Sequence, residues 1–79
     1  MDEIDKIINK MTNQEMKSLM KYYIDELLIC SKDKIKIVYG SISGAASMAL
    51  FAGELSGEDV SKIYDFRDRV SKVRFKLEI

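Results

Sequence analysis

The stretch DKIKIVYGSISGAASMALFA, residues 33–52, decides the fold, because its apolar residues fit two different periodicities. Residues 34–37 alternate between lysine and isoleucine, as a β-strand would. Over the whole stretch, however, apolar residues recur every three or four positions, which gathers them on one face of an α-helix. The residues on this spacing are Ile35, Val38, Ile42, Ala45, Ala49 and Ala52. We therefore predict a helix over residues 33–52.

A second face of this helix is also apolar and carries Ile37, Met48 and Phe51. A helix that is apolar nearly all round is normally covered on every side. With 79 residues, the chain has room for one domain, residues 1–79, and one modest core. The flanking helices can cover one apolar face, so we expect the other to bind a second copy of the chain, as a dimer or higher oligomer.

The sequence before residue 33 shows the marks of two helices. Residues 4–11 have the spacing of a short amphipathic helix. Thr12 and Glu15 then match a capping box, in which the two side chains accept hydrogen bonds from each other's backbone N–H groups. A second helix is predicted to start there. Its apolar stripe consists of Met16, Leu19, Met20, Tyr23, Ile24, Leu27 and Leu28.

Residues 53–59 carry the signals for one helix end and one helix start. Gly53 suits the left-handed conformation that ends many helices. Ser56 and Asp59 form a capping box for the helix that follows. The apolar stripe of this last helix consists of Val60, Ile63, Phe66, Val70, Val73 and Leu77. We predict an antiparallel helical hairpin in the C-terminal half, and hence a small all-α bundle of three to four helices.

An α+β fold is the alternative that these patterns leave open. Residues 73–79 alternate strictly between apolar and charged side chains, as an edge strand does, and would pair with a strand at residues 34–39. The chain has no proline and only four glycines, so it lacks most of the turn signals that strand-rich folds use. Helices are therefore the first prediction.

The composition excludes several classes of function. The chain has no histidine and one cysteine, Cys30, so neither an intrachain disulfide nor a Cys/His zinc site can form. Without histidine, acid–base catalysis would rest on carboxylates, lysines or tyrosines. The adjacent acidic pairs at 25–26 and 58–59 point about 100° apart on a helix and do not converge. We expect no enzymatic activity, no cofactor and no metal.

Charge and the N-terminal sequence indicate where the chain acts. Its 13 basic residues balance 13 acidic ones, so no overall field attracts nucleic acid or an anionic membrane. Residues 1–3 lack the basic region of a signal peptide, and Lys36, serines and glycines interrupt residues 35–52, which argues against a membrane span. A lone cysteine without an export signal points to the cytoplasm.

The segment GSISG, residues 40–44, has two physical interpretations. In a helix, Gly40 and Gly44 lie on one face and let a second backbone approach closely. After a strand, the same segment would be a loop that holds an anion at a helix N-terminus. The first interpretation predicts an interface, to which Tyr22 and Tyr64 add because they fall off their helix stripes. The predicted interface residues are Gly40, Gly44, Ala45, Met48, Phe51, Ile37, Tyr22 and Tyr64.

An anionic, nucleotide-like ligand would be held between tyrosines and basic side chains at such an oligomeric interface. The candidate residues are Tyr39, Ser43, Lys36, Arg69 and Arg74. The last two belong to a basic stripe over residues 67–76, which we interpret first as a solvated helix face. A weak nucleic-acid contact along this stripe is a further alternative.

The C-terminal half resembles the helical hairpins of short accessory proteins of Gram-positive phages and mobile elements. The segments that carry the resemblance are 39–40, 45–46, 49–50, 53–56 and 58–59. Many such proteins inhibit or sequester a host component, so the resemblance implies an interaction protein and assigns no individual residue.

Three functions follow as hypotheses. The first is a self-associating, non-enzymatic protein that binds or occludes a partner protein of the host. The second is an oligomer that sequesters a small anionic ligand. The third is a weak nucleic-acid binder.

Overall fold

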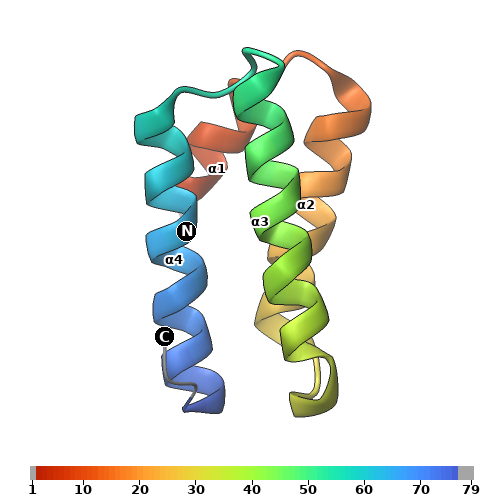
Figure 1. The fold of residues 1–79 in the computed structure, drawn as a ribbon, viewed down its shortest axis with the longest axis vertical. Helices are drawn as coiled ribbons and strands as arrows, with labels where there is room; N and C mark the ends of the chain where they lie inside the picture. Colours follow the sequence, from red (N-terminus) through yellow and green to blue (C-terminus); the bar gives the residue numbers. More distant parts are fainter. Residues whose placement is uncertain (1, 77–79) are drawn as a thin grey trace.

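The fold is an all-α bundle, seen in a computed structural model that describes residues 2–76. Its elements are α1 (Asp2–Asn9), α2 (Gln14–Ile29), the short 3₁₀ helix η1 (Lys32–Lys34), α3 (Ile35–Phe51) and α4 (Gly57–Phe75). The three long helices α2, α3 and α4 run side by side in alternating directions, and α1 lies behind α3, against α2 and α4 (Figure 1). The predicted helical bundle and its antiparallel hairpin, α3 followed by α4, are confirmed.

The α+β alternative is wrong at its first strand. Residues 34–39 belong to the end of η1 and the start of α3, and residues 73–75 complete α4; residues 77–79 lie outside the described part of the chain. Within residues 2–76 no strand forms. The helical spacing prevails because it places Ile35, Val38 and Ile42 together in the core, where each is less than a tenth exposed.

The core lies among the helices and draws side chains from each of α1 to α4. Met20, Ile24 and Leu27 of α2 are almost completely buried, as the stripe of that helix predicts, but Leu19 and Leu28 of the same stripe are exposed. On α3, Ala46 rather than the predicted Ala45 points fully inward: Ala46 is completely buried, whereas Ala45 is only half-buried. Small side chains here let α3 pack close to its neighbours.

The helix-start prediction at Ser56 is confirmed and the one at Thr12 is wrong. Ser56 Oγ accepts from the backbone N–H of Asp59, and the Asp59 carboxylate accepts from the N–H of Ser56. At α2, the N-cap is Asn13, whose side chain accepts from the N–H of Met16. Gly53 has the expected left-handed conformation, with φ 75°.

Thr12 is instead held by the loop between α3 and α4. The Glu54 carboxylate accepts three hydrogen bonds: from the backbone N–H of Thr12 at 2.7 Å, from the Thr12 hydroxyl at 2.8 Å, and from the N–H of Asn13 at 2.6 Å. This carboxylate fastens the α1–α2 turn to the α3–α4 loop, two segments about 40 residues apart. The hydrogen bond from the Asn13 N–H, followed by that from the Thr12 hydroxyl, lowers the pKa of Glu54.

We expect Glu54→Gln to lower the melting temperature at neutral pH and to leave it nearly unchanged in acid. The pKa of Glu54 is lower in the folded protein than its ordinary value of 4.5. The ionised carboxylate therefore stabilises the fold at pH values above 4.5, and this stabilisation is lost as the pH falls below 4.5. The difference in melting temperature between wild type and variant should therefore shrink below about pH 4.5.

Asp25→Asn is the matched control, because Asp25 is an exposed carboxylate in the C-terminal half of α2. Circular dichroism melts of the three proteins between pH 3 and 7 measure the effect. A Glu54→Gln deficit as large at pH 3 as at pH 7 would contradict the role of the charge.

Opposite Glu54, at the other end of the bundle, α4 caps the C-terminus of α2. The Arg74 guanidinium donates to the backbone carbonyl oxygens of Leu27 at 2.8 Å and Cys30 at 3.1 Å. The last carbonyls of a helix have no partners within the helix and carry partial negative charge, so a cation is well placed there.

Candidate interaction surface

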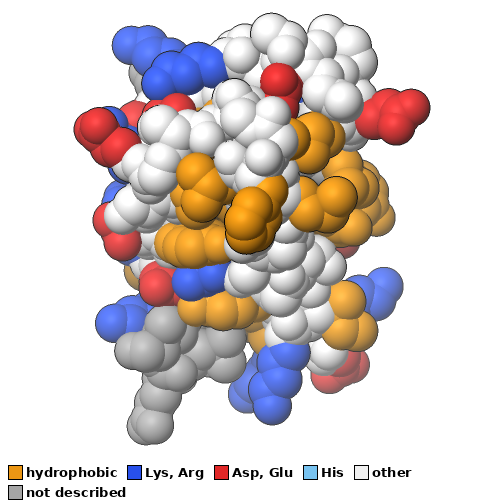
Figure 2. All heavy atoms as spheres, turned by 45° about the horizontal axis from the view of Figure 1, so that its top comes forward, with side chains coloured by type: hydrophobic (Ala, Val, Ile, Leu, Met, Phe, Trp, Pro, Cys, Tyr) orange, Lys and Arg blue, Asp and Glu red, His pale blue; other side chains and the backbone are white. Residues whose placement is uncertain are grey.

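The side of α3 that faces away from the core carries large apolar side chains in water. Ile37 is 72% exposed, Met48 is 64% exposed and Phe51 is 90% exposed. Gly40 and Gly44 are exposed between them. We call these five residues the outer α3 face. Figure 2 shows hydrophobic side chains gathered over the helix in front and its neighbours, with charged groups mainly toward the edges of the view.

The two glycines of this face are not required by the fold of the single chain. A Cβ atom added at Gly40 or Gly44 would meet nothing within 4 Å, and neither glycine has a positive φ. Each glycine inside a helix costs roughly 0.5–1 kcal/mol relative to alanine. The two glycines therefore lower the stability of α3 without improving the packing within one chain. They leave a flat strip of backbone that a second helix can approach.

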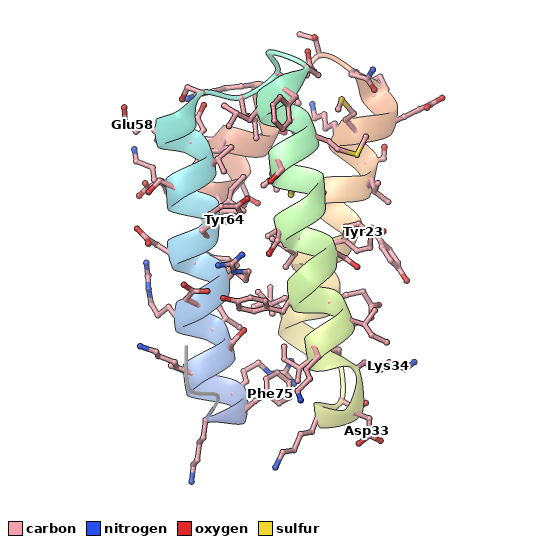
Figure 3. The ribbon with its side chains drawn as sticks, viewed as in Figure 1. Tyr23, Asp33, Lys34, Glu58, Tyr64 and Phe75 are labelled. Atoms are coloured by element: carbon pink, nitrogen blue, oxygen red, sulfur yellow. The ribbon has the colours of Figure 1, made fainter. Side chains whose placement is uncertain are left out.

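The apolar surface continues from α3 onto α2. Tyr22 is 58% exposed and Leu19 is 45% exposed, one turn apart on α2. Between the two helices lies a shallow groove of about 310 Å³. Its lining residues are Tyr22, Tyr23, Glu26, Lys34, Ile37, Val38 and Ser41. Tyr23 and Lys34 mark its extent along the side where α2 and α3 meet (Figure 3). The charged residues of this lining are Glu26 and Lys34, which have opposite signs, so the groove has no net charge.

Six of the eight predicted interface residues therefore lie on one continuous surface: the five of the outer α3 face and Tyr22 beside them. The other two are placed differently. Ala45 is half-buried and packs against the core. Tyr64 reaches from α4 toward α3 (Figure 3), where its hydroxyl donates to the Ser43 carbonyl oxygen at 3.2 Å and lies 2.9 Å from Ser47 Oγ.

Polar side chains form a second feature, in the contact between α3 and α4. Arg67 is only 9% exposed, and its guanidinium lies between the rings of Tyr39 at 4.0 Å and Tyr64 at 4.4 Å. It donates to the Asp68 carboxylate from Nε at 2.9 Å and to Ser43 Oγ from Nη1 at 2.5 Å. We call Tyr39, Ser43, Tyr64, Arg67 and Asp68 the Arg67 network.

The Asp68 carboxylate is the centre of negative charge in the Arg67 network. Burial alone would raise the pKa of Asp68, but hydrogen bonds from the Tyr39 hydroxyl and Arg67, together with the Arg67 charge, hold that pKa below its ordinary value. The pKa of Tyr39 is raised, first by burial and then by its hydrogen bond to Asp68. The Asp68 carboxylate thus already compensates the charge of the Arg67 guanidinium that it binds.

The five predicted ligand residues do not come together. Tyr39 and Ser43 are in the Arg67 network, and Lys36 is exposed near the start of α3. Arg69 and Arg74 line a separate apolar groove of about 270 Å³ between α4 and α2, together with Val70 and Val73 of α4 and Leu28 of α2. The Arg74 guanidinium also donates hydrogen bonds to the backbone carbonyls of Leu27 and Cys30.

The interpretation of residues 67–76 as a solvated stripe is wrong for Arg67 and holds for Arg69, Lys72 and Lys76, which are exposed. A signal for the network was present in the sequence. Polar residues recur at 39, 43 and 47 on α3 and at 64, 67, 68 and 71 on α4, the spacing of one helix face each. One of them, Ser71, is completely buried, and its hydroxyl has no hydrogen-bond partner among the described residues.

Comparison with protein-family models, with curated proteins and with solved structures finds no match to this chain. None of the helices within residues 2–76 combines the length and the apolar character needed to cross a membrane. The two features of the described residues that bear on function are the outer α3 face and the Arg67 network.

Proposed function

We propose that this protein is a small non-enzymatic interaction protein that self-associates through the outer α3 face and acts by binding or occluding a partner protein. The observation that carries the proposal is the exposure of Ile37, Met48 and Phe51 in one row along α3. Contiguous apolar surface of this kind is uncommon on monomeric proteins and marks interaction sites.

The size of the surface supports an interface. Leu19, Tyr22, Ile37, Met48 and Phe51 are between 45% and 90% exposed. At roughly 200 Å² for a fully exposed residue of this size, they present on the order of 700 Å². Specific interfaces bury about 800 Å² per partner. A second protein that covers this surface would therefore bury an area typical of a specific complex.

The two alternative functions have less support. In the Arg67 network the only buried guanidinium of the described chain already binds Asp68 and Ser43, so an anionic ligand would have to displace an intramolecular ion pair. The exposed basic residues Arg69 and Lys72 each follow an acidic residue of α4, Asp65 and Asp68, by four positions. A carboxylate beside each of these cations weakens phosphate binding. A role as an accessory protein of a phage or mobile element rests on the resemblance of the hairpin sequence alone.

We expect Phe51→Asp to convert a self-associated wild-type protein into a monomer. Phe51 is 90% exposed, so the substitution removes no core contact of the single chain, whereas an unpaired carboxylate buried in an interface is costly. Light scattering coupled to size-exclusion chromatography over a concentration series measures the change in mass.

Val73→Asp is the matched control, because Val73 is 78% exposed but lies on α4, away from the outer α3 face. We expect this variant to keep the wild-type mass. A wild type that stays monomeric up to millimolar concentration, or a Val73→Asp variant that dissociates as fully as Phe51→Asp, would refute self-association through α3.

A further inference from the structure

The order of large and small residues on the outer α3 face is nearly the same in both directions along the helix. Gly40 and Gly44 lie two positions on either side of Ile42, while Ile37 lies five positions before it and Met48 six positions after it. All four are on the exposed side, and Ile42 itself is completely buried beneath them. A large–small–small–large pattern of this kind matches itself when a second copy is turned end to end.

We infer that two copies of this chain pair through α3 in an antiparallel, two-fold symmetric contact that crosses at Gly40 and Gly44. The inference rests on the proposed function and specifies its partner and its geometry. In a two-fold interface each residue pair occurs twice, with the roles of the two copies exchanged. Gly40 of one copy then lies opposite Gly44 of the other, and Ile37 lies opposite Met48.

The glycines allow the two backbones to approach closely at the centre. Both positions have open space where a side chain would be. Small residues four apart create a flat contact strip that a second helix can approach. The described helix α3 carries a single charge, Lys36, which is off this strip, so no like charges face each other when two copies meet.

In the antiparallel arrangement, Phe51 of each copy lies near the groove between α2 and α3 of the other copy. Phe51 lies nine positions beyond Ile42, roughly 13 Å along the axis, and helical side chains lean back toward the N-terminus. On the partner, the groove between α2 and α3 runs along α3 from Ser41 to Lys34, so its far end lies roughly 12 Å on the other side of that copy's own Ile42. The exposed ring of each copy therefore reaches the groove of the other.

A parallel pairing lacks this match. It would set Phe51 against Phe51 of the partner subunit at one end of the contact and would leave both grooves between α2 and α3 unfilled. It would also align the two helix dipoles, whereas the antiparallel pairing opposes them favourably. The groove is beside the N-terminal half of α3, and the most exposed aromatic ring is at its C-terminal end. Only a reversed partner brings the two together.

Cysteine cross-linking distinguishes the two directions. In a Cys30→Ala background, which removes the native thiol, Ile37→Cys and Met48→Cys variants are oxidised separately and as an equimolar mixture. In the antiparallel pair, two copies of residue 48 are roughly 18 Å apart along the axis and two copies of residue 37 roughly 15 Å apart. A disulfide requires Cα atoms within about 7 Å. We therefore expect covalent dimer in the mixture, at least five-fold more than in either variant alone.

The possible results separate the geometry from the proposed function. Strong dimer from Met48→Cys alone would show a parallel contact and overturn this inference while leaving self-association intact. A non-covalent dimer of unchanged mass that yields no cross-link in any sample would place the contact on another surface and also overturn it. A wild-type protein that is monomeric by light scattering would refute the proposed function itself.

Gly44→Leu provides a second, independent test. A leucine at the crossing point would hold the helices apart, so we expect the dimer dissociation constant to rise at least ten-fold, measured by light scattering. We expect the monomer to tolerate this side chain, because Gly44 is exposed and a Cβ atom added there meets nothing within 4 Å. Ser31→Ala is the control, since Ser31 makes no side-chain capping bond at η1, and it should leave the dissociation constant within two-fold of wild type. An unchanged dissociation constant for Gly44→Leu would overturn the proposed crossing point.

Discussion

Leu27→Ala is expected to lower the free energy of unfolding by about 2–5 kcal/mol, which is the range for removing a fully buried leucine and leaving a cavity. Leu27 is completely buried between α2 and the other helices. At roughly 0.05–0.15 kcal/mol per residue, the total stability of a chain of this size is about 4–12 kcal/mol, so the loss would be a large part of it.

The neighbouring leucine provides a matched control for this prediction. Leu28 is on the same helix and one position along, but it is 36% exposed. Leu28→Ala removes the same atoms and should cost less than about 1 kcal/mol. Urea denaturation followed by circular dichroism, at one fixed protein concentration because self-association adds apparent stability, measures both variants. Equal losses at the two positions would mean that α2 faces the core differently.

Arg67→Ala is expected to cost about 2–4 kcal/mol, because it removes one of the two donors to the Asp68 carboxylate and the donor to Ser43 Oγ, and opens a gap between two aromatic rings. The Asp68 side chain is 32% exposed, so water can partly replace the lost hydrogen bond. For this reason the expected loss is about 1 kcal/mol smaller than the roughly 3–5 kcal/mol that is typical of a fully buried pair.

Two further variants test whether geometry or charge is responsible. Arg67→Lys keeps the charge but not the planar set of donors that reaches Asp68 and Ser43 together, so it should recover less than half of the loss. Arg69→Ala, two positions away and exposed, should remain within about 0.5 kcal/mol of wild type. Thermal and urea unfolding give these values. Full recovery by lysine would show that only the charge matters.

The helices and their inward faces could be predicted from the sequence because both depend on local spacing. Of the stripe that the 3/4 pattern predicted for α2, Met20, Ile24 and Leu27 are buried, whereas Leu19 and Leu28 at its edges are exposed. The Ser56 cap was also predictable, since its partner Asp59 is three residues away. The outer α3 face followed from the same reasoning, because a helix with two apolar faces in a short chain leaves one of them uncovered.

Contacts between distant segments could not be predicted in this way. Thr12 and Glu15 satisfy the local pattern of a capping box, yet Thr12 is bound by Glu54, which lies 42 positions further along the chain. The burial of Arg67 depends on Tyr39 and Ser43 of another helix. A charged residue next to other charged residues looks solvated in a sequence, and only the packing of α3 on α4 shows that this one is enclosed.

The contact of Arg74 with the end of α2 has a consequence for folding during synthesis. The carbonyl groups of Leu27 and Cys30 receive their hydrogen bonds from a residue 44 to 47 positions later in the chain. While the ribosome is still making residues 31–73, the last turn of α2 has no such partner, and the core between α2 and α4 is incomplete. The end of α2 therefore gains these two hydrogen bonds only after residue 74 has been made and α4 has packed against α2.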